Sequence, residues 1–311
     1  MLNFSEVNSI LITGANGFVG RSLIDEFARL PIEKLPSKLI LLTRRGLDFE
    51  LPPQLKKISN VHTVDLTKPW SVDHRVSHVV NLAADGSHSA YSAEANSRFE
   101  YIVHNLISWL SILDVKPRIF HASTGACFGY KPLEPRLNHI NPKMEFARSR
   151  ELAEKRLVDA SNTMGFELSI GRLFTFSGTH LLKKPQYAIS NFVISAVRNG
   201  IVDVKGDPNS VRSYLHQDAM AKWILASLIS PTQFLDLQIG SNDAVTLGTL
   251  ATFIADVTGS SINFSPNPPP GDIYLPENES TQVRLRVEEG VGWKIAVQKM
   301  IEEMRRSDGN F

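Results

Sequence analysis

A glycine-rich segment near the start of the chain has the composition of a phosphate-binding turn. It reads Thr13-Gly14-Ala15-Asn16-Gly17-Phe18-Val19-Gly20 and lies between the apolar residues 10–12 and a stretch whose apolar residues recur at helical spacing. Gly14 allows a tight turn, Gly17 lets backbone amides approach a pyrophosphate, and Gly20 lets the helix pack closely on the sheet. The helix N-terminus adds free N–H groups and partial positive charge. This turn therefore predicts a dinucleotide site.

A second group of residues predicts which dinucleotide is bound. Thr43-Arg44-Arg45 directly follow the apolar run 38–42, where NAD-binding proteins usually place a carboxylate against the ribose and where arginine accommodates an extra phosphate. The segment favours NADP over NAD, and a solvated basic loop is the alternative interpretation. Asp65, in an expected strand over 61–66, could face the adenine ring. The small residues that end the apolar segment 79–84 allow a backbone to lie flat against a cofactor.

The elements that must position these residues alternate between strand and helix. Buried parallel strands are expected at five apolar runs, which lie at residues 10–12, 38–42, 61–66, 79–84 and 118–122. A long amphipathic helix is expected over 97–113. This alternation predicts an α/β fold with a Rossmann-type, doubly wound parallel sheet.

The chain length suits one large domain or two smaller parts. We expect residues 1–170 to form an NAD(P)-binding Rossmann domain. Residues 171–311 should form mainly a smaller substrate-binding α/β part, with some segments returning to the Rossmann sheet. Within that part, a helix over 188–197 is expected beneath the nucleotide, followed by a strand over 201–204, and a helix over 291–305 closes the chain.

Composition and charge exclude several classes of protein. The 311 residues are 42% hydrophobic and carry a formal net charge of +1, so no bulk electrostatic field favours nucleic acid or an anionic membrane. Cys127 is the single cysteine, which excludes an internal disulfide and fits a reducing compartment. The sequence has no basic leader, no apolar run of membrane-spanning length, and no metal-ligand spacing around His88 or His121. We expect a cytoplasmic protein that binds no nucleic acid, membrane or metal.

Five further short motifs follow the glycine-rich turn in order. They are Asp65-Leu66, NLAA at 81–84, STGACFG at 123–129, GRLFTFSG at 171–178 and VRSYLHQD at 211–218. Together with TGANGFVG they resemble the successive motifs of the extended short-chain dehydrogenases/reductases, in the NAD-dependent epimerase/dehydratase family. The resemblance spans essentially the whole chain. It implies a Rossmann fold, an NAD(P) cofactor and a nucleotide-sugar ligand.

The motifs and the resemblance together assign residues to the two ligands. The expected cofactor-binding residues are Gly14, Asn16, Gly17, Phe18, Val19, Gly20, Thr43, Arg44, Arg45, Asp65, Leu66, Leu82, Ala83, Ala84 and Arg150. The resemblance implies that Thr124, Asn191 and Arg212 bind substrate, with Arg212 where family members commonly hold the nucleotide diphosphate. Many members pair through two long helices, here about 97–113 and 146–160, which implies a homodimer.

One motif departs from the family pattern. Active members carry Tyr-x-x-x-Lys on a helix, where the tyrosine moves the proton of a sugar hydroxyl while hydride passes to or from the cofactor. Ser149 and Glu154 fix the register, which places Phe146 at the tyrosine position and Arg150 at the lysine position. Phenylalanine has no proton to donate, whereas arginine retains the capacity to donate to the nicotinamide ribose. Thr124 matches the family's Ser/Thr, which hydrogen-bonds the reacting hydroxyl.

Other residues near this motif are considered as replacements for the missing acid. Gly125-Ala126 stand where the dehydratases of the group carry Asp-Glu, so elimination by that route is unsupported. Cys127 should face away from the substrate if Thr124 faces it, because side chains alternate along an extended segment. The remaining candidates are Tyr130, His139 and Glu145, on the loops that bound the site.

Two functions stay open at this point. The first is an NAD(P)-dependent nucleotide-sugar-modifying enzyme of the epimerase/reductase type, with an unconventional acid/base group. The second is a catalytically inactive relative that binds dinucleotide or nucleotide sugar as a regulatory or structural protein. The complete glycine-rich turn and Arg212 favour ligand binding in both, whereas Phe146 and Arg150 favour the second. We favour the first narrowly, because the chain keeps Thr124 and the whole substrate-side half.

Overall fold

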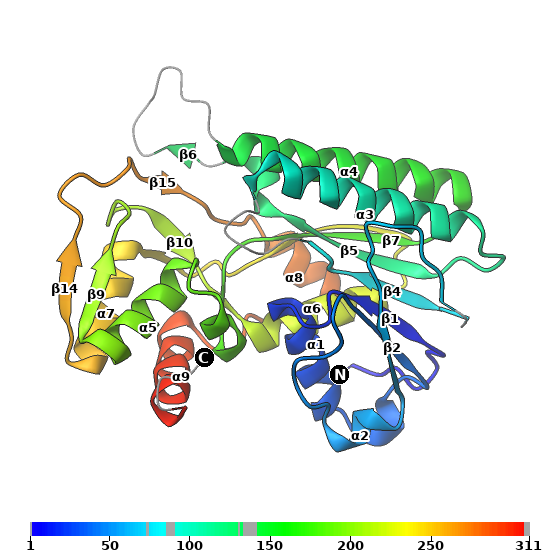
Figure 1. Cartoon of the computed structure of the whole chain (residues 1–311), viewed down its shortest axis with the longest axis horizontal. Helices are drawn as coiled ribbons and strands as arrows, with labels where there is room; N and C mark the ends of the chain where they lie inside the picture. The colour runs from blue at the N-terminus through cyan, green and yellow to red at the C-terminus, as the bar shows by residue number, and fades with distance from the viewer. Residues whose placement is uncertain (1, 73–74, 85–90, 130, 133–141, 308–311) are drawn as a thin grey trace.

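A seven-stranded parallel sheet forms the framework of the molecule (Figure 1). In the computed structural model, which describes residues 2–72, 75–84, 91–129, 131–132 and 142–307, its strand order is β12-β7-β5-β4-β1-β2-β3. These strands are β1 (Ile10–Thr13), β2 (Leu39–Thr43), β3 (Ser59–Thr63), β4 (His78–Asn81), β5 (Arg118–Thr124), β7 (Leu168–Leu173) and β12 (Phe234–Ile239). Every neighbouring pair is parallel. The predicted Rossmann-type sheet is therefore confirmed.

Helices cover both faces of this sheet (Figure 1). On one face, α1 (Phe18–Arg29) packs beside α6 (Gln217–Leu228), near the short α2 (Pro53–Lys56). On the other face, α3 (Ala93–Ser111) and α4 (Pro142–Met164) lie side by side. Within the described ranges, none of the helices combines the length and the apolar character that a membrane crossing requires.

Each face of the sheet has its own hydrophobic core. Phe27 and Trp223 are fully buried on the side of α1 and α6, and Phe99 and Trp109 are buried on the side of α3 and α4. Burying one large apolar side chain contributes ~1.5–3 kcal/mol. Strands β1 and β2 are buried along their whole length, which explains why their sequences are continuously apolar rather than alternating.

The second half of the chain adds a smaller α/β part around a third core. Its helices are α5 (Ala188–Asn199), α7 (Leu247–Thr258) and α9 (Trp293–Arg306), whereas α8 (Glu279–Leu285) packs against β12 and α6 of the large-sheet core. The strands outside the large sheet are β6 (Lys131–Pro132), which comes from the first half of the chain, and β8 (Phe176–Ser177), β9 (Ile201–Val204), β10 (Val211–Ser213), β11 (Leu215–His216), β13 (Ala244–Thr246), β14 (Ser261–Phe264) and β15 (Asp272–Ile273). Helices α5, α7 and α9 bury their apolar faces against one another and against β9.

The large sheet includes two strands that do not lie wholly within the expected first domain, residues 1–170. Strand β7 runs across the expected boundary at 170/171, and β12 lies beside it in the same sheet. The division into residues 1–170 and 171–311 stays a prediction. The helices expected over 188–197 and 291–305 correspond to α5 and α9.

Two strands end earlier than the sequence suggests. The strand expected over 61–66 is β3, and Asp65 lies beyond it because its carboxylate closes a turn by accepting hydrogen bonds from the residue two positions later. The strand expected over 79–84 ends at Asn81, because the N–H groups of the next two residues donate to a side chain of β1. Both differences place expected cofactor residues in turns at the edge of the sheet.

The two long helices begin earlier than the periodicity predicts. The helix expected over 97–113 is α3, which begins at Ala93 because Ser92 Oγ accepts a hydrogen bond from the Ala95 N–H at 3.1 Å and caps it. The helix expected over 146–160 lies within the longer α4.

Candidate functional site

The glycine-rich turn connects β1 to α1 at the carboxyl edge of the sheet. Strand β1 lies between β2 and β4, where the strand order reverses. Open α/β sheets bind ligands in the crevice outside the carboxyl ends of their strands at such a reversal point. Leu82, Ala83 and Ala84 follow β4 and lie against the turn, since a Cβ on Gly14 would be 3.3 Å from the Ala83 Cα. The structure therefore brings two of the predicted cofactor segments together.

The three glycines of the turn fit a closely bound pyrophosphate. Gly14 has φ of +70°, a left-handed conformation that favours glycine. A Cβ on Gly20 would lie 2.6 Å from the Gly14 carbonyl oxygen, and one on Gly17 would lie 3.1 Å from the same atom. Helix α1 begins at Phe18. Its N-cap residue is Gly17, so no N-cap side chain accepts hydrogen bonds from the first N–H groups of the helix. Those N–H groups are the donors that a phosphate at a helix N-terminus accepts from.

A hydrogen-bond network fixes the floor of this site. Thr13 Oγ1 donates to Asn81 Oδ1 at 2.8 Å and accepts from the N–H groups of Leu82 and Ala83, each at 3.0 Å. The Asn81 side-chain amide lies 2.9 Å from His121 Nδ1. Burial, helped by a nearby arginine, lowers the pKa of His121 to about 3, so the ring is neutral and forms part of the framework.

The loop after β2 is tied to the glycine-rich turn. Asn16 Nδ2 donates to the Gly46 carbonyl at 2.6 Å, and Asn16 Oδ1 accepts from the Asp48 N–H at 3.3 Å. Arg44 and Arg45 lie in this loop with exposed side chains. The loop that would meet the ribose is therefore anchored by Asn16, and its two arginines face solvent at the edge of the site.

The third predicted cofactor segment adjoins the same loop. Asp65 accepts hydrogen bonds from Thr67 Oγ1 at 2.7 Å and the Thr67 N–H at 3.1 Å, and these bonds lower its pKa. Arg44 also contributes to lowering this pKa, which places it near Asp65. Thr43 is buried at the end of β2, and Leu66 is half-buried after Asp65. Asp65 therefore stays ionised at neutral pH beside Arg44.

Thr124 ends β5 and is linked to a tyrosine from the second half of the chain. Thr124 is half-buried, pairs in register with Leu173 of β7, and its Oγ1 accepts from the Ala126 N–H at 3.2 Å. The Tyr274 hydroxyl lies 3.5 Å from the carbonyl oxygen of Leu173, the register partner of Thr124, which brings the phenol beside the Thr124 side chain. The ring centroids of Tyr274 and Phe174 are 4.9 Å apart. Thr124 therefore has a phenol beside it.

Phe146 and Arg150, at the positions expected for the family's tyrosine and lysine, lie in a stack of aromatic rings around the guanidinium. The Arg150 guanidinium carbon lies 3.5 Å from the ring centroid of Phe99 and 4.4 Å from that of Phe146. Arg150 is buried, and Phe146 also contacts the ring of Tyr91, with centroids 5.1 Å apart. The place expected for the family's acid is thus lined by packed rings, and Arg150 is held by a cation–π arrangement.

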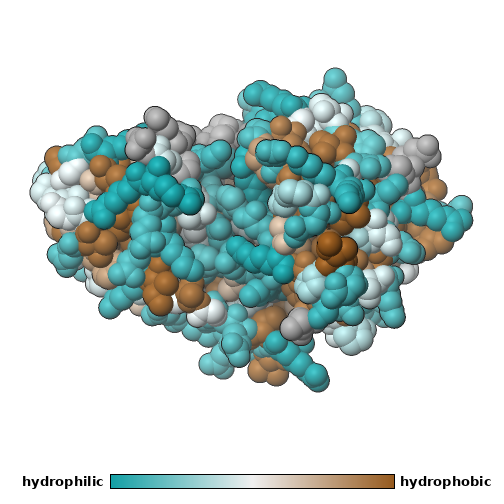
Figure 2. All heavy atoms as spheres, turned by 90° about the horizontal axis from the view of Figure 1, so that it is seen from below, coloured by the Kyte–Doolittle hydropathy of each residue, from teal (hydrophilic) through white to brown (hydrophobic). Residues whose placement is uncertain are grey.

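Arg212 lies on β10 and is engaged by the neighbouring strand β15. Its guanidinium pairs with the Asp272 carboxylate and donates to the carbonyl oxygens of Val211 at 2.8 Å and Asp272 at 3.1 Å. The guanidinium carbon lies 5.9 Å from the ring centroid of Tyr274. A chain of contacts therefore runs from Arg212 through Tyr274 to Thr124. Figure 2 shows hydrophilic residues gathered between the Rossmann part and the second part on the face seen from below.

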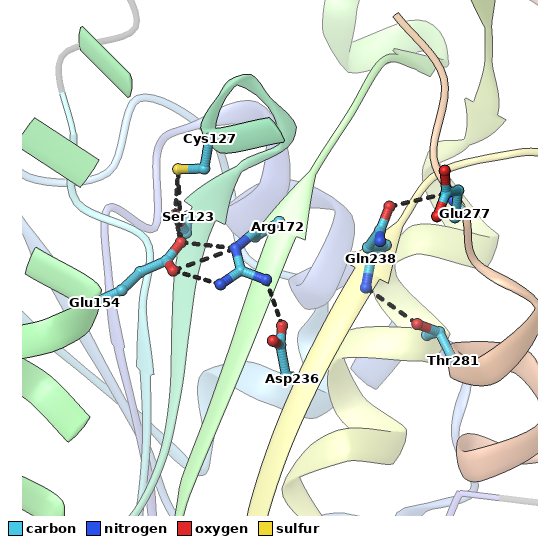
Figure 3. Close-up of polar contacts among 8 residues, drawn as sticks. All are labelled: Ser123, Cys127, Glu154, Arg172, Asp236, Gln238, Glu277 and Thr281. Carbon is cyan, nitrogen blue, oxygen red and sulfur yellow. Dashed lines mark hydrogen bonds and ion pairs between the residues drawn. The ribbon is translucent and has the colours of Figure 1, made fainter. Parts of the chain in front are cut away.

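Glu154 joins α4 to the sheet through Ser123 and Arg172 (Figure 3). It is buried, pairs with Arg172 at 2.6 Å and accepts a hydrogen bond from Ser123, while Arg172 also pairs with Asp236 at 2.6 Å. Cys127 Sγ lies 3.7 Å from the Glu154 carboxylate. These side chains lie beside a pocket of about 500 Å³ that Cys127, Glu154 and Arg172 help to line. Burial, reinforced by Glu154, raises the pKa of the Cys127 thiol to about 12, which makes it a poor acid/base group at neutral pH.

The remaining candidates are placed as follows. Tyr130, His139 and His88 lie outside the described residues. Glu145 is exposed on the first turn of α4, and Asn191 is half-buried in the first turn of α5. Within the described ranges, no cluster of three or more His, Cys, Asp or Glu side chains is arranged to hold a metal ion.

Sequence reasoning missed two residues at this site. Tyr274 and Asp272 were assigned no role, although they lie two positions apart in an extended segment, which places both side chains on one face. That spacing was the available signal. Strand β15 lies between β10 and β6, and this position brings Asp272 to Arg212 and Tyr274 to the neighbourhood of Thr124.

A comparison with protein families agrees with this geometry. Residues 10–240 match the model of the NAD-dependent epimerase/dehydratase family. The chain belongs to this family. The match begins with β1 and ends after β12, so it covers all seven strands of the large sheet.

Individual relatives share the fold at low sequence identity. UDP-glucuronic acid decarboxylase 1 of Arabidopsis thaliana is 24% identical over 271 residues, which cover 83% of this chain and 60% of that protein. The structure of MoeE5 in complex with UDP-glucose and NAD has a TM-score of 0.75 at 19% identity, covering 96% of this chain and 99% of that one. A tyrosine-to-phenylalanine variant of UDP-glucuronic acid 4-epimerase from Bacillus cereus, in complex with UDP-4-deoxy-4-fluoro-glucuronic acid and NAD, has a TM-score of 0.74 at 15% identity, covering 96% and 99%.

Proposed function

We propose that this chain binds NADP and a nucleotide sugar in one site and modifies the sugar as an epimerase or reductase, using an acid/base group other than Phe146. The observation that carries this proposal is the chain of contacts from Arg212 through Tyr274 to Thr124, which joins the second part to the carboxyl edge of the sheet. The solved neighbour MoeE5, whose complex contains UDP-glucose and NAD, supports both ligand classes.

In this proposal the chain's own residues divide the binding work. The α1 N-terminus and the glycine-rich turn bind the pyrophosphate of the cofactor, and Leu82–Ala84 pack against it. Arg212 binds the diphosphate of the nucleotide sugar, because a guanidinium matches phosphate oxygens in a two-pronged geometry. Thr124 hydrogen-bonds the reacting hydroxyl. When bound, the nicotinamide exchanges a hydride with the sugar carbon.

The preference for NADP rests on the loop after β2. Arg44 and Arg45 have exposed side chains directly beyond the strand, in a loop that Asn16 anchors to the glycine-rich turn. Their charge is available to a ribose phosphate. Asp65 lies near Arg44 but is itself turned toward Thr67.

Calorimetry with UDP-, dTDP-, GDP- and CDP-sugars tests the nucleotide-sugar site. At least one of them should bind, and Arg212→Ala should weaken its binding by ~1.5–3 kcal/mol, the usual contribution of a hydrogen bond to a charged group. Arg198→Ala is the matched control, because Arg198 is exposed on α5. No binding by any of the four classes would overturn the proposed function. Equal affinities of Arg212→Ala and Arg198→Ala would show that Arg212 does not bind the sugar nucleotide.

A second candidate function is favoured by the stack around Arg150. Phe146 cannot donate a proton and both residues are packed among rings, as expected of a relative that binds its ligands without turning them over. The tyrosine-to-phenylalanine variant of the Bacillus cereus enzyme holds both a sugar nucleotide and NAD, so that kind of substitution is compatible with binding in a family relative.

Turnover separates the two functions. If the chain is inactive, the unmodified protein should show no conversion of any bound sugar nucleotide, and Phe146→Tyr with Arg150→Lys should recover some, because acid/base groups typically contribute ~10²–10⁴-fold. Phe146→Leu is the control for packing. Conversion by the unmodified protein that survives Phe146→Leu would reject the inactive function and support an acid/base group elsewhere.

We also propose that two copies pair through α3 and α4. On the outer surface of these helices, 59% of Tyr101 and 48% of Leu152 are exposed to solvent. Covering such apolar groups with a second copy of the chain is favourable. Light scattering should give the mass of a dimer, and Leu152→Glu should shift it toward that of a monomer. A monomeric unmodified protein would contradict this arrangement.

A further inference from the structure

Among the described tyrosines, Tyr274 has a hydroxyl that reaches Thr124. Two contacts help to fix its position: the 3.5 Å approach of the hydroxyl to the Leu173 carbonyl, and the tilted packing of its ring on Phe174, with centroids 4.9 Å apart. Leu173 is the register partner of Thr124. The phenol oxygen therefore lies at the carboxyl ends of β5 and β7, where the expected substrate residue ends its strand.

The backbone around Tyr274 is held on both sides. The Tyr274 N–H donates to the Val211 carbonyl at 3.1 Å, and β15 just before it pairs with both β10 and β6. Two positions earlier, Asp272 pairs with Arg212. A side chain on such a braced segment needs little ordering when a ligand arrives, which is the condition under which a positioned group contributes most to binding and reaction.

We propose that Tyr274 donates its phenolic hydrogen to the ligand oxygen that Thr124 binds, and so supplies the proton donor that Phe146 lacks. This inference rests on the proposed nucleotide-sugar function. Thr124 is only half-buried, so a ligand oxygen that bonds its hydroxyl arrives beside the phenol.

The charge state of the phenol suits donation. Tyr274 is only 6% exposed, and this burial raises its pKa, while the Thr124 hydrogen bond opposes the rise. The phenol thus keeps its proton at neutral pH. In the proton step the Tyr274 O–H bond breaks, an O–H bond forms on a ligand oxygen that has gained negative charge, and the phenolate takes a proton from water afterwards.

Two other phenols lie near this place and are the alternatives to be tested. Tyr91 packs edge-on against Phe146, and Tyr91 and Tyr187 are 44% and 45% exposed. Burial raises the pKa of Tyr187 and of Tyr274, and Tyr91 adds to both shifts, so Tyr91 acts electrostatically on both phenols. Tyr91 lies against the ring at the family's tyrosine position, whereas Tyr274 lies against Thr124.

The experiment removes one phenol oxygen at a time from the full-length protein. Tyr274→Phe keeps the ring that stacks on Phe174, Tyr91→Phe tests the alternative, and Tyr101→Phe is the matched control on the exposed face of α3. UDP-glucose and UDP-glucuronic acid are the probes, with NADPH present. Binding is measured by calorimetry and by the ligand-induced absorbance difference of tyrosine near 287 nm, with melting curves to confirm that each variant folds.

We expect Tyr274→Phe to abolish the tyrosine difference signal and to weaken binding by about 10-fold, the upper range for one hydrogen bond. Tyr91→Phe and Tyr101→Phe should keep the tyrosine difference signal and the affinity of the unmodified protein. Thr124→Val should lose the same signal, because it removes the partner that brings the ligand oxygen to the phenol. For a probe that is turned over, kcat of Tyr274→Phe should fall by ~10² or more, and KM should rise by no more than the loss of affinity.

Three outcomes overturn the inference. A signal and affinity in Tyr274→Phe equal to those of Tyr101→Phe would show that the phenol does not touch the ligand. Loss of the signal in Tyr91→Phe alone would assign the role to Tyr91. Unaltered kcat in Tyr274→Phe would reject proton donation. In each of these cases the sugar nucleotide still binds, so the proposed function survives. Failure of the unmodified protein to bind any sugar nucleotide would instead overturn the proposed function, and this role with it.

Discussion

The carboxylate of Asp272 lies 2.5 Å from the guanidinium of Arg212, and both side chains are largely buried, with 21% and 15% of their surfaces exposed. The arginine expected to hold a diphosphate is therefore already neutralised by a carboxylate from β15. A buried charge with its partner removed is costly, so this pair is stable in the absence of ligand. If Arg212 binds a diphosphate as proposed, the incoming ligand competes with Asp272 for the same guanidinium.

Removing the Asp272 charge should tighten the binding of sugar nucleotides. Asp272→Asn keeps the shape of the side chain, lifts the competition for Arg212 and removes a negative charge beside the phosphates, so the dissociation constant should fall by about 10-fold, as for one hydrogen bond to a charged group. Calorimetry with the best-bound sugar nucleotide measures it. Asp256→Asn, exposed on α7, is the control. Weaker binding in Asp272→Asn than in Asp256→Asn would mean that the aspartate supports the site instead of competing with the ligand.

Removing both exposed arginines after β2 should abolish the preference between the two dinucleotides. We expect NADPH to bind more tightly than NADH, and Arg44→Ala with Arg45→Ala to remove most of the difference, since a charge-assisted contact contributes ~1.5–3 kcal/mol. Fluorescence titration with both cofactors measures the preference. Arg305→Ala with Arg306→Ala, at the far end of α9, controls for the loss of net charge. Equal affinities of the unmodified protein for NADPH and NADH would reject the preference.

The stack around Arg150 should make that position sensitive to the shape of the cation. Arg150→Lys keeps the charge but loses the planar group that lies between Phe99 and Phe146, so the free energy of unfolding should fall by about 1–2 kcal/mol. Arg148→Lys, exposed on the same helix, should change it by less than ~0.5 kcal/mol. Urea denaturation measures both. Equal effects of the two substitutions would show that the stack contributes no stability.

The parts of this site that the sequence predicts are those held by local chain geometry. Gly14 and Gly20 are recognisable because the turn requires a left-handed conformation and a close approach of backbone atoms, and both requirements act within a few residues. The alternation of apolar runs likewise predicts the sheet. Asp65 was placed in a strand because its neighbours are apolar, but a side-chain turn with Thr67 overrides that pattern.

The contacts that the sequence could not predict join distant segments. Tyr274 and Thr124 are far apart in the chain, and no short-range pattern says that β15 returns beside β10. The motif predicts Phe146 at the tyrosine position, but it does not predict the packing there, because Phe99 comes from another helix to complete the stack on Arg150. Glu154, which served only to fix the register of the motif, proves to hold α4 to β5 and β7.

Cys127 should react slowly with alkylating reagents in the folded protein. Only the thiolate is nucleophilic, and burial raises the pKa of this thiol to about 12, with the Glu154 carboxylate adding to the rise. At pH 8 the thiolate fraction is therefore far below that of an ordinary thiol, and iodoacetamide should react at least ~10²-fold more slowly than with the unfolded chain. The chain has one cysteine, so mass spectrometry of the whole protein follows this single site.

The pH dependence of that reaction distinguishes a raised pKa from simple shielding. With a raised pKa, the rate in the folded protein should keep climbing about tenfold per pH unit through pH 10, whereas the unfolded chain in guanidinium should level off near its ordinary pKa of about 8.5. Shielding alone would lower the plateau and leave the midpoint unchanged. A folded-state rate at pH 8 equal to that of the unfolded chain would contradict both explanations, since it requires a thiol open to solvent, and Cys127 would then return as a candidate for the acid/base group.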